Sequence, residues 1–183
     1  MFSKQKSEEN IGHLKNLIRS IDDYPKVGIV YRDITTIIKD KLAFQLLIDM
    51  LAEDINTEDI DVVVGIEARG FIIGSAIAYK IKKGFVPIRK KNKLPSKKIL
   101  EDYELEYGID TLEIHTDSII RGQRILLIDD LLATGGTTVA AAKLISRLGG
   151  DIKIISYIFE LLELNGRKLL TEYCHDIRSL IQY

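Results

Sequence analysis

One segment of the chain, which reads RILLIDDLLATGGTTV from residue 124, constrains the fold more than any other. Its apolar run 125–128 is continuous, which is typical of a strand buried on both faces of a sheet. The run ends in two adjacent carboxylates, Asp129 and Asp130, and a turn of small residues then leads into a helix over 137–148 that stops at Gly149. This order of elements predicts a strand-to-helix crossover of a parallel sheet.

The middle and the end of the chain repeat this alternation. Short β-branched or apolar runs at 61–66, 85–88 and 152–159 predict strands, and the apolar stretch 71–82 predicts a helix. A final strand is expected within 171–183. We therefore expect one α/β domain of 183 residues, with a largely parallel central sheet flanked by helices. Ligands of such sheets bind in the loops beyond the carboxyl ends of the strands.

The N-terminal part is expected to be helical around an irregular stretch. Apolar residues recur at helical spacing from Ile11 to Ile21 and predict a first helix, and 24–39 is read as loop-rich. Asp40 is placed to cap a second helix whose apolar face begins at Leu42.

Two segments after the middle of the chain look exposed. The stretch 90–107 is long and polar, and we expect it to be irregular. Leu112 and Ile114 alternate with polar residues as in an exposed strand.

The composition excludes several classes of protein. With 26 basic and 27 acidic residues the net charge is -1, which gives no general electrostatic case for nucleic-acid or membrane binding. The only cysteine is Cys174, so no intrachain disulfide is expected. The first ten residues are polar and no apolar run approaches the ~20 residues of a membrane span, so we expect a cytoplasmic protein.

The segment after residue 124 carries the groups of a sugar-phosphate site. Burying Asp129 beside Asp130 is costly unless sugar hydroxyls or a divalent cation pair with them. The motif itself offers the two carboxylates no evident basic partner, so we expect them to repel each other. The small-residue turn 133–138 combines glycines, threonine hydroxyls and a helix N-terminus, which is an arrangement suited to a phosphate.

This segment resembles the signature with which the type I phosphoribosyltransferases bind 5-phosphoribosyl pyrophosphate (PRPP). The sequence LLIDDLLATGGT is similar to the corresponding sequence in the adenine-using branch of that family. The resemblance implies the type I fold, with a small hood at about 24–40 and a mobile catalytic loop at about 90–108. It implies that Asp129 and Asp130 bind the ribose hydroxyls. The 5′-phosphate would be bound by Ala133, Thr134, Gly135, Gly136 and Thr137.

The stretch VVVGIEARGF, from residue 62, ends a strand in Glu67-Ala68-Arg69-Gly70. Taken alone it could be a charged strand-to-helix turn. It resembles the pyrophosphate loop of the same family, which implies that Arg69 and Gly70 face the diphosphate. Arg69 is also expected to reach the base and to act in catalysis.

The stretch YPKVGIVYRDITT, from residue 24, indicates by itself only a loop with an exposed aromatic residue. It is similar to the segment that covers the base in the adenine-using branch. The similarity implies that Val30 offers backbone groups to adenine, that Tyr31 stacks on the ring and that Arg32 holds the site together. Tyr24 and Tyr31 stand where phenylalanine is common, and tyrosine retains the stacking face.

The stretch RKKNKLPSKKILEDYELEYG, from residue 89, has the composition of a solvated basic loop. It resembles the catalytic lid of the same family. On that resemblance Glu106 lies near the purine imidazole edge as a catalytic residue, with Tyr107 beside it. The basic residues would face diphosphate, in the same subunit or in the neighbouring subunit of a homodimer. They are Arg89, Lys90, Lys91 and Lys93.

The reaction implied is the transfer of the phosphoribosyl group of PRPP to adenine, giving AMP and pyrophosphate in purine salvage. Mg²⁺ is the implied cofactor, carried by PRPP near Asp129 and Asp130. Two alternatives stay open. One is a phosphoribosyltransferase for another base, against which the hood and lid patterns stand. The other is a regulator that senses PRPP without catalysis, for which 183 near-neutral residues leave little room for a nucleic-acid-binding element.

Overall fold

The computed structural model of the chain describes residues 4–104 and 108–183. The chain divides into two compact units, Met1–Glu53 and Asp54–Tyr183. The elements of the first unit are α1 (Lys4–Leu17), β1 (Arg19–Ile21), β2 (Tyr31–Asp33), α2 (Thr35–Ile38) and α3 (Lys41–Ala52).

The first unit combines three helices with a two-stranded antiparallel ribbon. Strands β1 and β2 pair from Arg19 opposite Asp33 to Ile21 opposite Tyr31. The expected first helix is therefore too long, because α1 ends at Leu17 and the following residues turn into β1. Helix α3 begins where predicted, since the side chain of Asp40 accepts hydrogen bonds from the first backbone N–H groups of the helix.

The second unit alternates strands and helices. Its elements are η1 (Thr57–Asp59), β3 (Val62–Ile66), α4 (Arg69–Lys80), β4 (Gly84–Lys90), β5 (Lys98–Glu104), β6 (Ile109–His115), β7 (Arg124–Leu132), α5 (Gly136–Leu148), β8 (Asp151–Glu160), η2 (Leu162–Leu164), α6 (Arg167–Leu170) and β9 (Ile177–Gln182).

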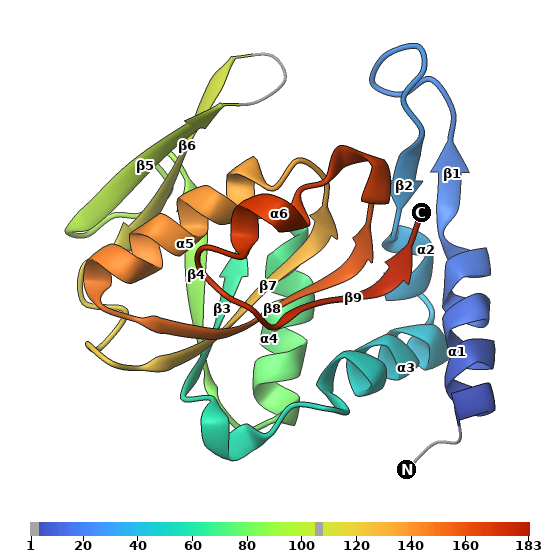
Figure 1. Cartoon of the computed structure of the whole chain (residues 1–183), viewed down its shortest axis with the longest axis horizontal. Coiled ribbons are helices and arrows are strands. Elements are labelled where there is room, and N and C mark those ends of the chain that lie inside the picture. Colours follow the sequence, from blue (N-terminus) through green and yellow to red (C-terminus); the bar gives the residue numbers. More distant parts are fainter. Residues whose placement is uncertain (1–3, 105–107) are drawn as a thin grey trace. The chain divides into compact units, whose positions relative to one another are not determined.

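A seven-stranded sheet in the order β5-β6-β4-β3-β7-β8-β9 forms the centre of the second unit (Figure 1). The strands from β4 to β9 in this order are parallel to their neighbours. Strand β6 is antiparallel to β4 and β5, and β5 with β6 forms a ribbon that extends from the sheet in Figure 1. The largely parallel α/β sheet predicted from the sequence is confirmed.

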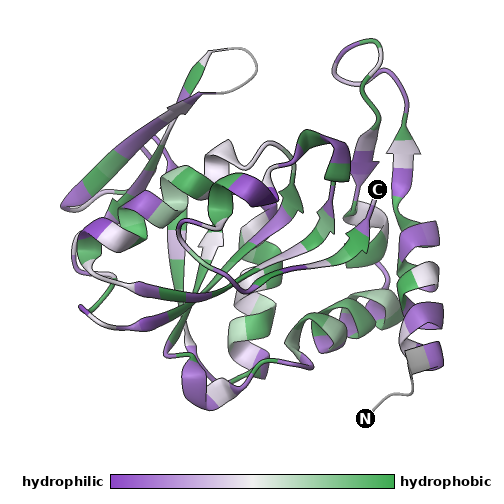
Figure 2. Ribbon diagram, in the orientation of Figure 1, coloured by the Kyte–Doolittle hydropathy of each residue, from purple (hydrophilic) through white to green (hydrophobic). Residues whose placement is uncertain are grey.

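Helices α4 and α5 pack against the sheet through alternate residues of β7. Ile125 and Leu127 belong to the apolar cluster that includes Ala141 of α5, whereas Ile128 approaches Gly74 of α4. Successive strand residues point to opposite faces, so the two helices lie on different faces of the sheet. The central strand β3 is buried along its whole length, as expected for a strand covered on both faces, whereas the ribbon of β5 and β6 carries long hydrophilic stretches in Figure 2.

Two expectations for the region around the ribbon are wrong. Residues 98–104, expected to be irregular, form β5, because each of them pairs with a residue of β6. Leu112 and Ile114, expected on an exposed strand, have no solvent exposure. Both side chains belong to the core cluster that includes residues of α5.

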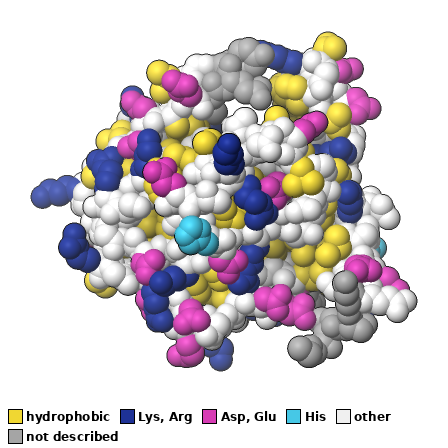
Figure 3. Space-filling view, in the orientation of Figure 1, with side chains coloured by type: hydrophobic (Ala, Val, Ile, Leu, Met, Phe, Trp, Pro, Cys, Tyr) yellow, Lys and Arg dark blue, Asp and Glu magenta, His cyan; other side chains and the backbone are white. Residues whose placement is uncertain are grey.

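The surface of the described residues mixes both signs of charge. On the face drawn in Figure 3, basic and acidic side chains are interspersed over the molecule. No helix within residues 4–104 and 108–183 has the length and apolarity needed to cross a membrane.

Candidate active site

The carboxyl ends of the neighbouring strands β3 and β7 bring two predicted motifs to one edge of the sheet. Val62 pairs with Ile125 and Gly65 with Ile128, so the turns that follow the two strands lie side by side. A cavity of about 390 Å³ opens at this edge. It is lined by Glu67, Ala68, Arg69, Lys90, Tyr103, Asp110, Asp129, Asp130, Leu131, Ala133, Thr134, Gly135, Gly136, Thr137 and Thr138.

The turn between β7 and α5 forms one wall of the cavity, and we call residues 133–137 the phosphate loop. Gly135 has φ of +89°, a left-handed conformation that favours glycine. Gly136 begins α5, so the unpaired N–H groups and the positive end of the helix dipole lie at the cavity. Thr138 is held from behind, because its Oγ1 accepts a hydrogen bond of 2.8 Å from the hydroxyl of Tyr157. This wall therefore has the backbone donors and the helix N-terminus that suit a phosphate group.

The acidic pair at the end of β7 has a basic partner in the neighbouring turn. Nε of Arg69 lies 2.9 Å from Oδ2 of Asp130, whose side chain is buried. The motif itself offers no basic partner, as expected, and the charge of Asp130 opposes ionisation of Asp129. The sequence did not reveal that the pairing of β3 with β7 brings Arg69 to the pair from a separate motif.

The two carboxyl groups differ in their environment. Burial and the adjacent charge of Asp130 raise the pKa of Asp129 well above its ordinary value. Burial also raises the pKa of Asp130, while the charge of Arg69 opposes that rise. Oδ1 of Asp129 accepts a hydrogen bond of 2.9 Å from the backbone N–H of Asp130. Asp129 is therefore the member of the pair that takes up the first proton as the pH falls.

Gly70 allows the first turn of α4 to approach β7. A Cβ atom at this position would lie 2.9 Å from the carbonyl oxygen of Ile128 and 3.1 Å from Oδ1 of Asp129. Gly70, which was predicted to face diphosphate, thus lies against the end of β7 next to Asp129. The preceding turn includes a cis peptide bond between Glu67 and Ala68.

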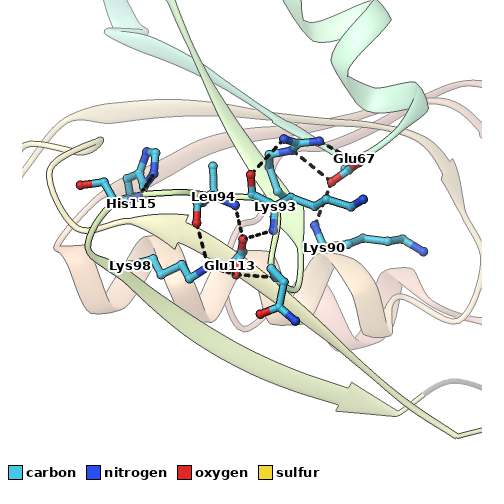
Figure 4. A network of polar contacts seen from close by, with 10 residues as sticks. Glu67, Lys90, Lys93, Leu94, Lys98, Glu113 and His115 are labelled. Atoms are coloured by element: carbon cyan, nitrogen blue, oxygen red, sulfur yellow. Dashed lines mark hydrogen bonds and ion pairs between the residues drawn. The ribbon is translucent and has the colours of Figure 1, made fainter.

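Of the basic residues predicted to bind diphosphate from the lid, Lys90 is the one that lines the cavity. Its Nζ lies 3.3 Å from Oδ2 of Asp110. Arg89 instead forms two hydrogen bonds to the carboxylate of Glu67, at 3.1 and 3.2 Å, and a third to the carbonyl oxygen of Lys93 (Figure 4). Burial would raise the pKa of Glu67, but these bonds and one from the backbone N–H of Lys90 hold it below its ordinary value.

A buried carboxylate organises the segment that follows Lys90. Glu113 has no solvent exposure and accepts hydrogen bonds from the backbone N–H groups of Asn92, Lys93 and Leu94 (Figure 4). Nζ of Lys98 lies 2.8 Å from the same carboxylate. Burial opposes ionisation, yet these donors lower the pKa of Glu113 from 4.5 to about 2. Glu113 is therefore a fixed negative charge beneath the basic segment.

Sequence reasoning missed Tyr103 and Asp110 in the cavity wall. The hydroxyl of Tyr103 donates a hydrogen bond of 3.2 Å to Oδ2 of Asp110. Burial raises the pKa of Tyr103, so its hydroxyl stays protonated at neutral pH. The two residues lie opposite each other on β5 and β6, and only the pairing of these strands could have pointed to them.

The residues predicted to contact adenine belong to the first unit. Tyr31 begins β2, and its ring packs edge-on against Tyr24 with the centroids 5.3 Å apart. Val30 is 40% exposed, and the guanidinium of Arg32 donates a hydrogen bond to the hydroxyl of Ser20. Glu106 and Tyr107, predicted for the lid, lie outside the described residues.

The donor set suits a metal that arrives with its substrate. Within residues 4–104 and 108–183, no group of three or more His, Cys, Asp or Glu side chains could hold a metal ion. Mg²⁺ usually binds one or two carboxylates together with substrate phosphates and water. The carboxylates of Asp129 and Asp130 beside an anion site fit that mode.

The phosphate loop, the acidic pair and the turn that carries Arg69 thus meet at one edge of the sheet. This combination of groups is suited to an enzyme that acts on a sugar phosphate. The family model described as phosphoribosyl transferase domain matches residues 35–177. The chain therefore belongs to the phosphoribosyltransferase family.

Relatives narrow the class further. An adenine phosphoribosyltransferase of Brachyspira hyodysenteriae is 54% identical over 170 residues, which cover 93% of this chain and 99% of that protein. The crystal structure of adenine phosphoribosyltransferase from Thermoanaerobacter pseudethanolicus superposes with a TM-score of 0.90 at 48% identity, covering 94% of this chain and 99% of that one. The Saccharomyces cerevisiae enzyme, solved with adenine and an imino-altritol bisphosphate, gives a TM-score of 0.85 at 32% identity, with coverages of 94% and 99%. These similarities place the chain among the adenine phosphoribosyltransferases.

Proposed function

We infer that the protein transfers the 5-phosphoribosyl group of PRPP to adenine and releases AMP and pyrophosphate, a step of purine salvage. The observation that carries this function is the cavity in which the phosphate loop, the acidic pair and Arg69 meet. Relatives at about half identity over nearly the whole chain, named adenine phosphoribosyltransferase, support adenine as the base.

We propose that each wall of the cavity binds one part of PRPP. The phosphate loop, Ala133–Thr137, binds the 5′-phosphate through backbone N–H groups and threonine hydroxyls. Asp129 and Asp130 accept hydrogen bonds from the ribose hydroxyls. Arg69 lies at the turn expected to hold the diphosphate, with Lys90 at the end of the neighbouring parallel strand β4.

In the reaction the C1–oxygen bond to pyrophosphate breaks and a bond from C1 to a purine nitrogen forms, while that nitrogen loses its proton. Such displacements pass through an oxocarbenium-like state with positive charge on the sugar. The acidic pair stabilises that charge, and Arg69 and Lys90 stabilise the negative charge that develops on the departing diphosphate. We propose Glu106 as the group that accepts the purine proton, with Tyr107 beside it.

Mg²⁺, when bound with PRPP, neutralises diphosphate charge and thereby favours the leaving group. Asp129 and Asp130 are the residues that would hold it. Within the protein, the ion pair to Arg69 orients Asp130 before any ligand enters.

The remaining assignments rest on the family resemblance. We propose that Val30, Tyr31 and Arg32 bind adenine, that Gly70, Arg89 and Lys93 support the diphosphate turn, and that 90–108 acts as a lid. The family match runs from residue 35 to residue 177 across both compact units, which supports one functional domain. We further propose a homodimer in the cytoplasm, and the dimer can be tested by sedimentation equilibrium.

The decisive experiment is a turnover assay with PRPP, Mg²⁺ and adenine, in which AMP and pyrophosphate are measured in equal amounts. We expect formation of both products to depend on PRPP and on adenine. A protein that binds PRPP but forms no AMP would instead be a sensor, and the proposed activity would be wrong.

A further inference from the structure

A short segment after β8 lies directly against the phosphate loop, and we call residues 161–167 the backing segment. It is joined to the end of β7, because the backbone N–H of Leu161 donates a hydrogen bond of 2.9 Å to the carbonyl oxygen of Leu132. Leu132 immediately precedes the phosphate loop. The two segments therefore leave the sheet side by side.

The closest approach between them is at Gly166, which is buried. A Cβ atom on Gly166 would overlap the carbonyl oxygen of Ala133 and would lie 2.8 Å from the carbonyl carbon of Thr134 and 2.9 Å from the nitrogen of Gly135. All three are backbone atoms of the phosphate loop, so none can rotate away as a side chain would. The reverse contact is equally close, since a Cβ on Gly135 would lie 2.8 Å from the carbonyl oxygen of Gly166.

Backbone conformation does not explain the glycine at this position. Gly166 has φ of −59° and ψ of −30°, which any residue adopts, and it leads into α6. Alanine would suit these angles at least as well as glycine does. The need for a residue without a side chain comes from the contact with the phosphate loop.

The backing segment is itself firmly held. Arg167 forms a forked pair of hydrogen bonds to the carboxylate of Glu160, and it also donates to the hydroxyl of Ser179 and to the carbonyl oxygen of Ile177. Hydrogen bonds from Arg167 lower the pKa of Glu160, so the pair stays charged at neutral pH. A rigid surface therefore lies behind the loop.

We propose that Gly166 is a positioning residue that sets the conformation of the phosphate loop, and hence the affinity for the 5′-phosphate of PRPP. The proposal rests on the proposed function of that loop. Gly166 acts by letting the backing segment touch the backbone of Ala133–Gly135. A methyl group there displaces the N–H groups that face the phosphate, while the turn at Arg69 on the neighbouring strand keeps its geometry.

The test compares Gly166→Ala with Gly84→Ala, which adds a methyl group at an exposed glycine where the new atom meets Val62 at an ordinary 3.8 Å. Affinities for ribose 5-phosphate and for magnesium pyrophosphate are measured calorimetrically, together with KM and kcat for PRPP and the melting temperature. For Gly166→Ala we expect ribose 5-phosphate affinity to fall at least about tenfold, the loss of one charge-assisted hydrogen bond. KM for PRPP should rise by a similar factor, while pyrophosphate affinity stays within about twofold. Gly84→Ala should match the parent protein.

Unchanged ribose 5-phosphate affinity in a folded Gly166→Ala protein would overturn the proposal. So would an equal loss of both ligands with early melting, because that pattern indicates general damage. If Gly166→Ala does not fold, Arg167→Lys replaces it, since it keeps the charge opposite Glu160 but loses the forked geometry that holds the backing segment. We expect the same selective loss in this variant, and its absence would count against the proposal. A parent protein that binds neither ribose 5-phosphate nor PRPP would contradict the proposed function itself.

Discussion

Nε of Arg69 lies 2.9 Å from Oδ2 of Asp130, so a cation from the turn after β3 neutralises a carboxylate at the end of β7. In the free protein this ion pair compensates the buried charge of Asp130. In the proposed function Arg69 would bind diphosphate as a second partner.

Arg69→Ala should weaken PRPP binding by roughly tenfold to a hundredfold, the range for losing a charge-assisted hydrogen bond. The free energy of unfolding should fall by about 1 kcal/mol, because Asp130 loses its partner but can take up a proton. Lys153→Ala is the control, since Lys153 pairs at the surface with Asp151. Calorimetry with Mg²⁺ that gives equal PRPP affinity for both variants would leave Arg69 with a structural role alone.

Replacing both Asp129 and Asp130 by asparagine should lower turnover by roughly two orders of magnitude, at ~1.4 kcal/mol per tenfold in rate. The cause is the loss of negative charge beside the sugar, which also weakens the hydrogen bonds from its hydroxyls because asparagine is a neutral acceptor. Activity and melting temperature should be measured on the same preparation. A double variant that melts early and keeps its full activity would exclude the pair from the reaction.

The stability of the protein should fall with rising pH because of Asp129. Between the ordinary carboxyl pKa of about 3.9 and the raised pKa of Asp129, the folded state holds a proton that the unfolded chain has released. The free energy of unfolding therefore decreases as the pH rises through this window and stays lower above it. Asp129→Asn should remove this slope and raise the melting temperature at neutral pH.

Melting curves of the parent protein and of Asp129→Asn across the acidic range check this expectation. Asp117→Asn, at an exposed position, is the matched control. If the parent and Asp129→Asn lose stability in parallel as the pH rises, the carboxyl group of Asp129 is not the cause.

Glu113 should have the opposite effect on stability, which it should increase as the pH rises. Its pKa is lowered from 4.5 to about 2, so its contribution to stability is present above the ordinary value and is lost as the pH falls toward 2. Glu113→Gln should cost about 2–4 kcal/mol at neutral pH, because a buried acceptor of several N–H groups becomes a partial donor. Urea unfolding of this variant beside the exposed Glu163→Gln measures the difference. Equal stability of the two variants would show that the segment after Lys90 does not need the buried charge.

Base choice is the fifth expectation. Adenine should be used far better than hypoxanthine or guanine, because the hood and lid sequences resemble the adenine-using pattern and the similar proteins are named adenine phosphoribosyltransferases. PRPP-dependent rates with the three bases decide the point. Comparable rates with guanine would leave the family assignment intact and remove the specificity.

The parts of the site that are local in the chain were predictable. The acidic pair lies near the end of β7 and the phosphate loop follows the same strand, so a single stretch of sequence was enough to predict that they lie together. Asp40 at the start of α3 is local in the same sense. The ion pair of Arg69 with Asp130 was not predictable, because it exists only once β3 lies beside β7.

The prediction for the ribbon of β5 and β6 failed for a related reason. Residues 98–104 lie in a largely polar stretch and follow a basic run, so composition favoured a loop, yet each residue has a partner on β6 in the paired strands. Glu113 looked like the solvent-facing residue of an alternating strand, but the backbone of residues 92–94 covers it and supplies its donors. Burial by another segment leaves no mark on the local pattern.

The position of β3 also governs the order in which the molecule can assemble. On one side its Val62 pairs with Gly84, which emerges soon afterwards in synthesis, but on the other it pairs with Ile125, far along the chain. One edge of β3 therefore stays unpaired until β7 has been formed. Pairing two strands so far apart in the sequence is slow. The acidic pair and the anion-binding turn belong to the late-arriving strand and the helix behind it. During refolding, catalytic activity should thus return after most of the helical signal, and the waiting strand edge is where a stalled chain would associate with others.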